Sequence, residues 1–193
     1  MNRLEKAFDL FDSFNKQDPH QVNWNGVDYA AEYFYALQLY HWVLKLEPGA
    51  GEDLLLASRS QHIGRWKIPR NEYPAGKAGY LRWRTDLKKF HAEVAGKLLS
   101  EAGYEQQTIG SVQHIILKEG IKTDHQVQVM ENALCLVFLQ FQYADFISNH
   151  DDSKVIRIIQ KSWTKMSTPG REAALNLNYA ERGKVLIEKA LAK

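Results

Sequence analysis

The sequence predicts an all-α fold, a single helical bundle-like domain of about seven to nine helices over residues 1–193. Two observations lead to this prediction. Apolar residues recur at helical spacing along nearly the whole chain, and strand-like alternation nowhere continues for more than a few residues. Glycine and proline separate the helical segments, as they do at helix ends. A chain of 193 residues is long enough for one compact core and short for two.

The first two predicted helices precede the basic part of the chain. The first covers about residues 2–15 and is followed by a polar turn that ends near Gly26. Asp28 then begins a long helix rich in aromatic residues, DYAAEYFYALQLYHWVLKL. This helix ends at EPGAG, because the ring of Pro48 cannot continue a helix.

The third and fourth predicted helices flank a proline-rich segment. The third covers about residues 52–65, and the fourth covers about residues 79–101 and is closed by Gly103. Between them, residues 68–79 (IPRNEYPAGKAG) contain two prolines and two glycines. This composition predicts a surface loop, and its place in the chain makes it a candidate lid.

The second half of the chain is also helical. Asp124 is suited to cap a strongly apolar helix, and Thr168-Pro169 is typical of a helix start. The predicted helices cover about residues 105–118, 125–149, 151–166, 168–175 and 181–192.

Composition indicates a folded protein without a membrane anchor. No run of about 18 uncharged apolar residues occurs, and Glu5 and Asp9 interrupt the first segment where a secretory signal is apolar. We therefore expect a cytoplasmic protein. The single cysteine, Cys135, cannot form an internal disulfide and lies in the apolar run ALCLVFL, which predicts a buried, inert thiol.

Charge is concentrated in one segment of the chain. The formal net charge is +2, yet residues 58–90 contain nine basic and two acidic residues. Such a local excess predicts an anionic partner, either a phosphorylated small molecule or a nucleic acid. No membrane partner is expected, and the sequence leaves the oligomeric state open.

Residues 57–66, ASRSQHIGRW, resemble the AxLLHDIG turn of the HD metal-dependent phosphohydrolases, and HAEVAGKLLSEAGY from His91 resembles the segment that follows it. The resemblance implies an HD-like core over about residues 28–150, with helices 151–193 packed on it. It also implies a divalent metal (Mn, Fe, Ni or Zn) for phosphoester hydrolysis. At the positions of the HD ligands this chain has Tyr35, Gln61, His62 and Glu131 or Asn132.

A closer resemblance covers most of the chain from Ala57 to Leu175. The segments QHIGRWKIPRNEYPAGKAGYLRWRTDLKKFHAEVAG, MENALCLVFL and KSWTKMSTPGREAAL resemble the domain of unknown function 4202. Members share the pattern AQHIxRWxIPRxxYPxxxxGYLxWRxxLxxFHAExAG, and Asn132 stands where they usually have Asp. The family name carries no function, so a functional hypothesis depends on the residues.

The candidate site combines imidazoles with guanidinium groups. If the third and fourth predicted helices pack together, His62 and His91 approach each other inside a ring of arginines, which suits a phosphate or carboxylate ligand. The catalytic candidates are His62, His91 and Glu93. The metal candidates are His62, His91 and Glu131. The phosphate-binding candidates are Arg59, Arg65, Trp66, Arg82, Trp83 and Arg84.

Three functional classes remain open at this point. The first is an HD-like hydrolase acting on a phosphorylated or nucleotide-like small molecule. The second is a catalytically degenerate module that binds a nucleotide, RNA or another anion in a basic His/Arg/Trp pocket. The third is a scaffold whose aromatic helix, Tyr29 to Trp42, faces a partner. Several of these residues also have a simpler interpretation: His62 as a structural residue, Trp66 and Trp83 as packing, and Arg70, Lys77, Lys88 and Lys89 as a solvated face.

Overall fold

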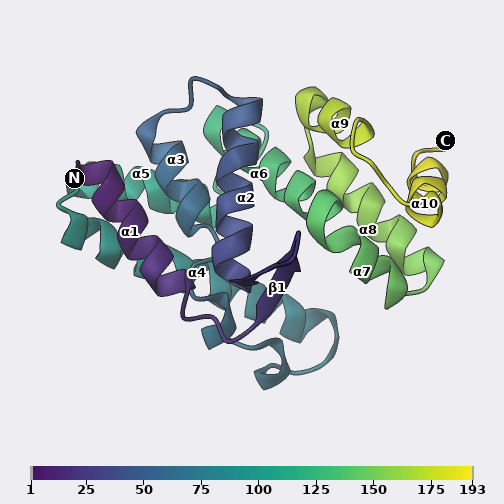
Figure 1. The fold of residues 1–193 in the computed structure, drawn as a ribbon, viewed down its shortest axis with the longest axis horizontal. Helices are drawn as coiled ribbons and strands as arrows, with labels where there is room; N and C mark the ends of the chain where they lie inside the picture. Colours follow the sequence, from purple (N-terminus) through teal and green to yellow (C-terminus); the bar gives the residue numbers. More distant parts are fainter. Residues whose placement is uncertain (1, 193) are drawn as a thin grey trace.

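The computed structural model describes residues 2–192 and confirms the all-α prediction (Figure 1). These residues form ten α-helices, one two-stranded antiparallel sheet, and short 3₁₀ and π segments. The predictions that include Met1 and Lys193 fall, at those two positions, outside the described residues. Within the described range, no helix is long and apolar enough to cross a membrane.

The N-terminal elements place two helices and a hairpin before the basic segment. Asn2 caps the first helix, since its side chain accepts from the Glu5 amide at 2.8 Å and the Glu5 carboxylate accepts from the Asn2 amide at 2.8 Å. The elements are α1 (Arg3–Asn15), β1 (Gln21–Trp24), β2 (Val27–Ala30), α2 (Ala31–Leu46) and α3 (Glu52–Ser60).

The hairpin corrects the prediction that a helix begins at Asp28. Trp24 pairs with Val27, so Asn25 and Gly26 form a two-residue loop, and both have positive φ (52° and 80°). Asn-Gly is the preferred sequence for such a loop, because both positions need a left-handed backbone. Asp28 therefore lies in β2, and α2 begins three residues later.

The chain turns sharply after α3, which ends at Ser60, about five residues earlier than the sequence predicts. Gly64 has φ +69°, and a Cβ at this position would lie 2.9 Å from ring carbons of both Phe14 and Phe90. Only glycine combines this backbone with so close an approach. Two 3₁₀ turns follow, η1 (Arg65–Lys67) and η2 (Arg70–Glu72), and then the 27-residue helix α4 (Gly76–Ala102).

The second half differs from the prediction at one place. The predicted helix 125–149 is divided by the π-helical turn η3. A π-helical turn contains more residues than an α-helical turn, so the side chains after it point in different directions from those of a continuous α-helix. This division raises the number of helices above the predicted range. The elements are α5 (Gln106–Leu117), α6 (His125–Val137), η3 (Phe138–Gln142), α7 (Tyr143–Ser148), α8 (Asp152–Lys165), α9 (Thr168–Leu175) and α10 (Glu181–Leu191).

One contiguous cluster of buried apolar side chains extends from α1 to α10, with Phe11 and Leu186 near its two ends. Helix α2 packs against α3 and α6, and α4 packs against α1 and α5. The C-terminal helices α8 and α10 pack on each other, while α9 packs on α6. In Figure 1 the N-terminal and C-terminal helices lie at opposite ends of the molecule, with α6 between them.

Candidate functional site

The largest concentration of the predicted site residues lies in a cavity of about 290 Å³. The turn after α3 forms one wall and α4 a second, and the end of α5, α6, η3 and α8 form the others. We call it the cationic cavity. Its polar lining residues are Gln61, His62, Arg65, Arg84, Lys88, His91, Lys118, Glu131, Gln142 and Ser162.

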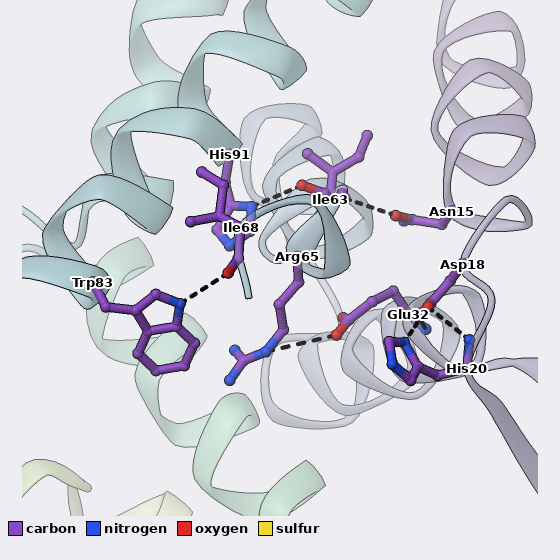
Figure 2. Close-up of polar contacts among 10 residues, drawn as sticks. Asn15, Asp18, His20, Glu32, Ile63, Arg65, Ile68, Trp83 and His91 are labelled. Atoms are coloured by element: carbon purple, nitrogen blue, oxygen red, sulfur yellow. Dashed lines mark hydrogen bonds and ion pairs between the residues drawn. The ribbon is translucent and has the colours of Figure 1, made fainter. Parts of the chain in front are cut away.

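His62 and His91 face each other in this cavity. Their ring centroids are 5.8 Å apart, which confirms the expectation that the two imidazoles approach. His91 is 2% exposed, and its Nδ1 lies 2.7 Å from the carbonyl oxygen of Ile63 (Figure 2). A carbonyl oxygen only accepts, so Nδ1 carries the proton and Nε2 of His91 keeps its lone pair.

Both imidazoles are held neutral near pH 7. Burial lowers the pKa of His91 to about 4, against a smaller opposing effect of its bond to Ile63. Burial also lowers the pKa of His62 well below its usual value, and the charges of Arg65 and other nearby basic groups lower it further. A neutral imidazole keeps a lone pair that can accept a proton, and a bound anion would raise its pKa toward neutrality, where a general base works best.

Four cationic side chains line the same cavity: Arg65, Arg84, Lys88 and Lys118. Arg84 has no carboxylate partner among residues 2–192, and its guanidinium lies 5.8 Å from the ring centroid of Tyr80. Burial lowers the pKa of Lys88, and the charges of Lys118 and Arg84 lower it further. The cations therefore repel one another in a partly desolvated space, a condition that a bound anion relieves.

Glu131 is engaged by two lysines rather than free. One of its oxygens lies 2.7 Å from Nζ of Lys118, and the other lies 3.2 Å from Nζ of Lys165. Burial would raise the pKa of Glu131, but these two ammonium groups together hold it below its usual value. The predicted metal set of His62, His91 and Glu131 would thus require Glu131 to leave both lysines. The side chains fit an anion better than a divalent cation, and the metal site stays a prediction.

Several predicted site residues lie away from the cationic cavity. Arg59 points into the core, where it pairs with Asp12 and lies 4.9 Å from the centroid of Phe8. The side chain of Arg82 is 77% exposed beside Asp86. Glu93 is exposed on another face of α4. Trp66 packs against Phe14, while Arg65, Trp83 and Arg84 do line the cavity.

Sequence reasoning missed Lys118 and treated Lys88 as part of a solvated face. Lys118 follows α5 with a left-handed backbone (φ 58°), which turns its side chain back toward Glu131. No sequence motif signals this contact, because it joins two elements through tertiary packing. Gln61, at the position of an HD ligand, donates to the carbonyl oxygen of Ile116 at 3.1 Å.

Asn132 binds Ser167, the residue before α9, instead of lining the cavity. Its Oδ1 accepts from the Ser167 amide at 3.0 Å, and its Nδ2 donates to the Ser167 hydroxyl at 2.8 Å. Gly170 leaves room for this contact, since a Cβ there would lie 2.7 Å from Asn132. Asn132 therefore attaches the start of α9 to α6. An aspartate would accept the same amide bond, so Asn in place of the family Asp is compatible with this role.

The fold and the site together define a class of protein: an α-helical protein with a neutral histidine pair in a cationic cavity. A scan against family models matched residues 5–187 to the domain of unknown function DUF4202, and the chain belongs to this family. This confirms the closer of the two resemblances, and the HD resemblance stays a prediction. Comparisons with curated proteins and with solved structures found no match.

Proposed function

We propose that this protein binds a phosphorylated small molecule in the cationic cavity. One observation carries the proposal: among the described residues that line the cavity, four are cationic and Glu131 is the one carboxylate, already paired with Lys118 and Lys165. The unpaired Arg84 adds a planar set of donors that matches phosphate geometry.

A phosphate monoester suits this cavity better than a nucleic acid does. A volume of about 290 Å³ lies at the lower end of small-molecule sites, and the walls come from several elements that are far apart in the sequence. A nucleic-acid backbone would instead require an open basic surface along which successive phosphates bind. The dianionic charge of a phosphate monoester also offsets more of the local positive charge than a carboxylate would.

Hydrolysis of the bound phosphate ester is a second candidate function, favoured by the neutral histidine pair. Nε2 of His91 can accept a proton from a water that attacks phosphorus. As the bond from phosphorus to the ester oxygen breaks, the protonated imidazole returns this proton to the leaving oxygen. The surrounding guanidinium and ammonium groups would stabilise the negative charge in the transition state. No metal takes part in this proposal.

Isothermal titration calorimetry with inorganic phosphate tests the binding proposal. The Arg84→Gln variant is expected to bind phosphate about tenfold or more weakly, because a charge-assisted hydrogen bond contributes roughly 1.5–3 kcal/mol. Arg82→Gln is the matched control, since Arg82 lies two residues away on the same helix with an exposed side chain. Equal losses in both variants, or no phosphate binding to the wild type, would contradict the proposal.

Phosphate release from a panel of phosphomonoesters tests the second function. The His91→Asn variant keeps a donor toward Ile63 but lacks the Nε2 acceptor, so it is expected to lose at least about a hundredfold in rate. Phosphate binding measured by calorimetry should persist in that variant. Elemental analysis of protein purified without metal exposure tests the predicted Mn, Fe, Ni or Zn site. Stoichiometric metal that His62→Ala and His91→Ala remove would favour an HD-like mechanism instead.

A further inference from the structure

A second cavity, of about 270 Å³, lies on the other side of Arg65 and Trp83. These two residues line both cavities, so the cavities adjoin at their side chains. We call this space the tryptophan cavity. Its lining residues are Asp18, His20, Ala31, Glu32, Arg65, Trp66, Ile68, Pro69, Arg70 and Trp83.

The aromatic walls of the tryptophan cavity are fixed in place. Nε1 of Trp83 donates to the carbonyl oxygen of Ile68 at 2.9 Å, which sets the orientation of the indole (Figure 2). The ring of Trp66 packs against Phe14 with centroids 5.9 Å apart. Arg70 is committed to the backbone of its own loop, donating to Tyr73 at 2.9 Å and to Pro74 at 3.0 Å. The cavity thus offers preformed flat surfaces that suit a planar ring or the apolar face of a sugar.

Glu32 is the unexplained group in this cavity. Its side chain is 11% exposed, and its nearest charged partner is Arg65, whose Nε lies 3.8 Å away, beyond hydrogen-bonding distance (Figure 2). Asp18 accepts from the Glu32 amide at 3.0 Å, but no donor in residues 2–192 reaches the Glu32 carboxylate. The carboxylate therefore faces the cavity, and its hydrogen bonds are left to whatever occupies that space.

The pKa of Glu32 agrees with this geometry. Burial raises it from 4.5 to about 7, and the nearby charge of Arg65 offsets only part of the effect. A hydroxyl or amino group from a ligand would supply the donor that the protein does not.

We propose that the tryptophan cavity holds the organic part of the phosphate ester, and that Glu32 recognises it by accepting a hydrogen bond from a ligand hydroxyl. Arg65 stands between the two cavities, where it can contact the phosphate and keep Glu32 in place. The ligand class is a hydroxyl-bearing phosphate ester, whether a sugar phosphate or a nucleotide. This inference rests on the proposed function, because it assumes that the phosphate occupies the cationic cavity.

Calorimetry with three ligands tests the inference: inorganic phosphate, methyl phosphate and ribose 5-phosphate. Wild-type protein is expected to bind ribose 5-phosphate at least about tenfold more tightly than methyl phosphate, which has no hydroxyl. In Glu32→Gln this preference should fall about tenfold, while inorganic phosphate binds as well as before or better, because Arg65 loses a neighbouring negative charge. Glu181→Gln is the matched control, since Glu181 also lies in the first turn of a helix but is exposed.

The outcomes separate this inference from the proposed function. Suppose that phosphate binds and that Arg84→Gln weakens this binding, but that the wild type binds ribose 5-phosphate no more tightly than methyl phosphate. The inference is then overturned while the proposed function stands. If no phosphate binds, both fail. The wild-type comparison needs no variant, so a misfolded Glu32→Gln protein would not prevent the test. Adenosine monophosphate distinguishes a nucleotide from a sugar phosphate. If it binds more tightly than ribose 5-phosphate and Trp66→Leu removes this difference, the ligand is a nucleotide. If the two bind equally, the ligand is a sugar phosphate.

Discussion

At the residue scale, the neutral state of His91 links the candidate site to folding. Its ring is 2% exposed and its Nδ1 is bound to Ile63, so protonation of Nε2 would place a charge in the core beside Arg65. An imidazole that must stay neutral makes the folded state bind fewer protons than the unfolded chain does.

This linkage predicts a pH dependence. The pKa of His91 falls from 6.5 to about 4 on folding, so the unfolding free energy should decrease as the pH is lowered from 6.5 to 4. The full effect for one imidazole is about 3 kcal/mol. His62 shifts in the same direction and adds to the loss. Urea unfolding at several pH values measures the slope, and His91→Asn should make it shallower. If the slope in that variant is unchanged, this would contradict the assignment of His91 as a buried neutral imidazole.

Titration of Glu32 changes the unfolding free energy in the opposite direction over part of the same pH range. Its pKa rises from 4.5 to about 7 on folding, so the folded state binds more protons between these values. Its contribution to stability is present below pH 4.5 and is lost as the pH rises through 7. Glu32→Gln should therefore steepen the loss of stability on acidification that the histidines cause. Comparing this variant with His91→Asn in the same titration separates the two groups.

At the element scale, the turn that presents His62 depends on Gly64. Gly64→Ala combines a left-handed backbone with contacts of 2.9 Å to Phe14 and Phe90. We expect a loss of about 2–4 kcal/mol in unfolding free energy, from backbone strain and overpacking. Gly110→Ala is the control, because Gly110 lies within α5 and a Cβ there meets nothing within 4 Å. That variant should be stabilised by roughly 0.5–1 kcal/mol. Urea unfolding of both variants provides the measurement.

The elements that the sequence predicted well are those with strong local signals. The start of α6 and the end of α4 are predicted correctly because their capping residues, Asp124 and Gly103, are evident in the sequence. The hairpin was missed even though Asn25-Gly26 is a standard signal, because its strands are only four residues long. The π turn at Phe138–Gln142 has no local signal. It accompanies a tertiary contact in which Nε1 of Trp42 donates to Gln140 at 2.8 Å.

The candidate site was predicted in part. Charge clustering and helical spacing identified His62, His91, Arg65 and Arg84, which the fold brings to one cavity. The same reasoning included Arg59, whose partner Asp12 lies 47 residues earlier in the chain. Whether a basic residue faces a cavity or a buried carboxylate depends on such distant partners. Spacing within one helix cannot distinguish the two cases.

At the scale of the whole molecule, repulsion among the cations of the cationic cavity lowers the stability of the ligand-free protein and favours binding of an anion. Burial lowers the pKa of Lys88 most, and repulsion from Lys118 and Arg84 lowers it further; this repulsion is present whenever no anion is bound. Arg84→Gln should therefore match or exceed the wild type in unfolding free energy without ligand, while it binds phosphate more weakly. Phosphate should raise the melting temperature of the wild type more than that of the variant. Scanning calorimetry with and without phosphate measures both effects, and a less stable unliganded variant would contradict this account.

The single cysteine offers a built-in reporter of cavity opening. Cys135 lines the cationic cavity, is 7% exposed, and burial raises the pKa of its thiol to about 12. Since it is the one thiol in the sequence, any alkylation by a maleimide reagent records a transient exposure of this wall. With reagent in excess, so that alkylation outpaces reclosing, the alkylation rate gives the frequency at which the cavity opens. A bound phosphate ester should slow that rate, which would reveal occupancy without any knowledge of the reaction.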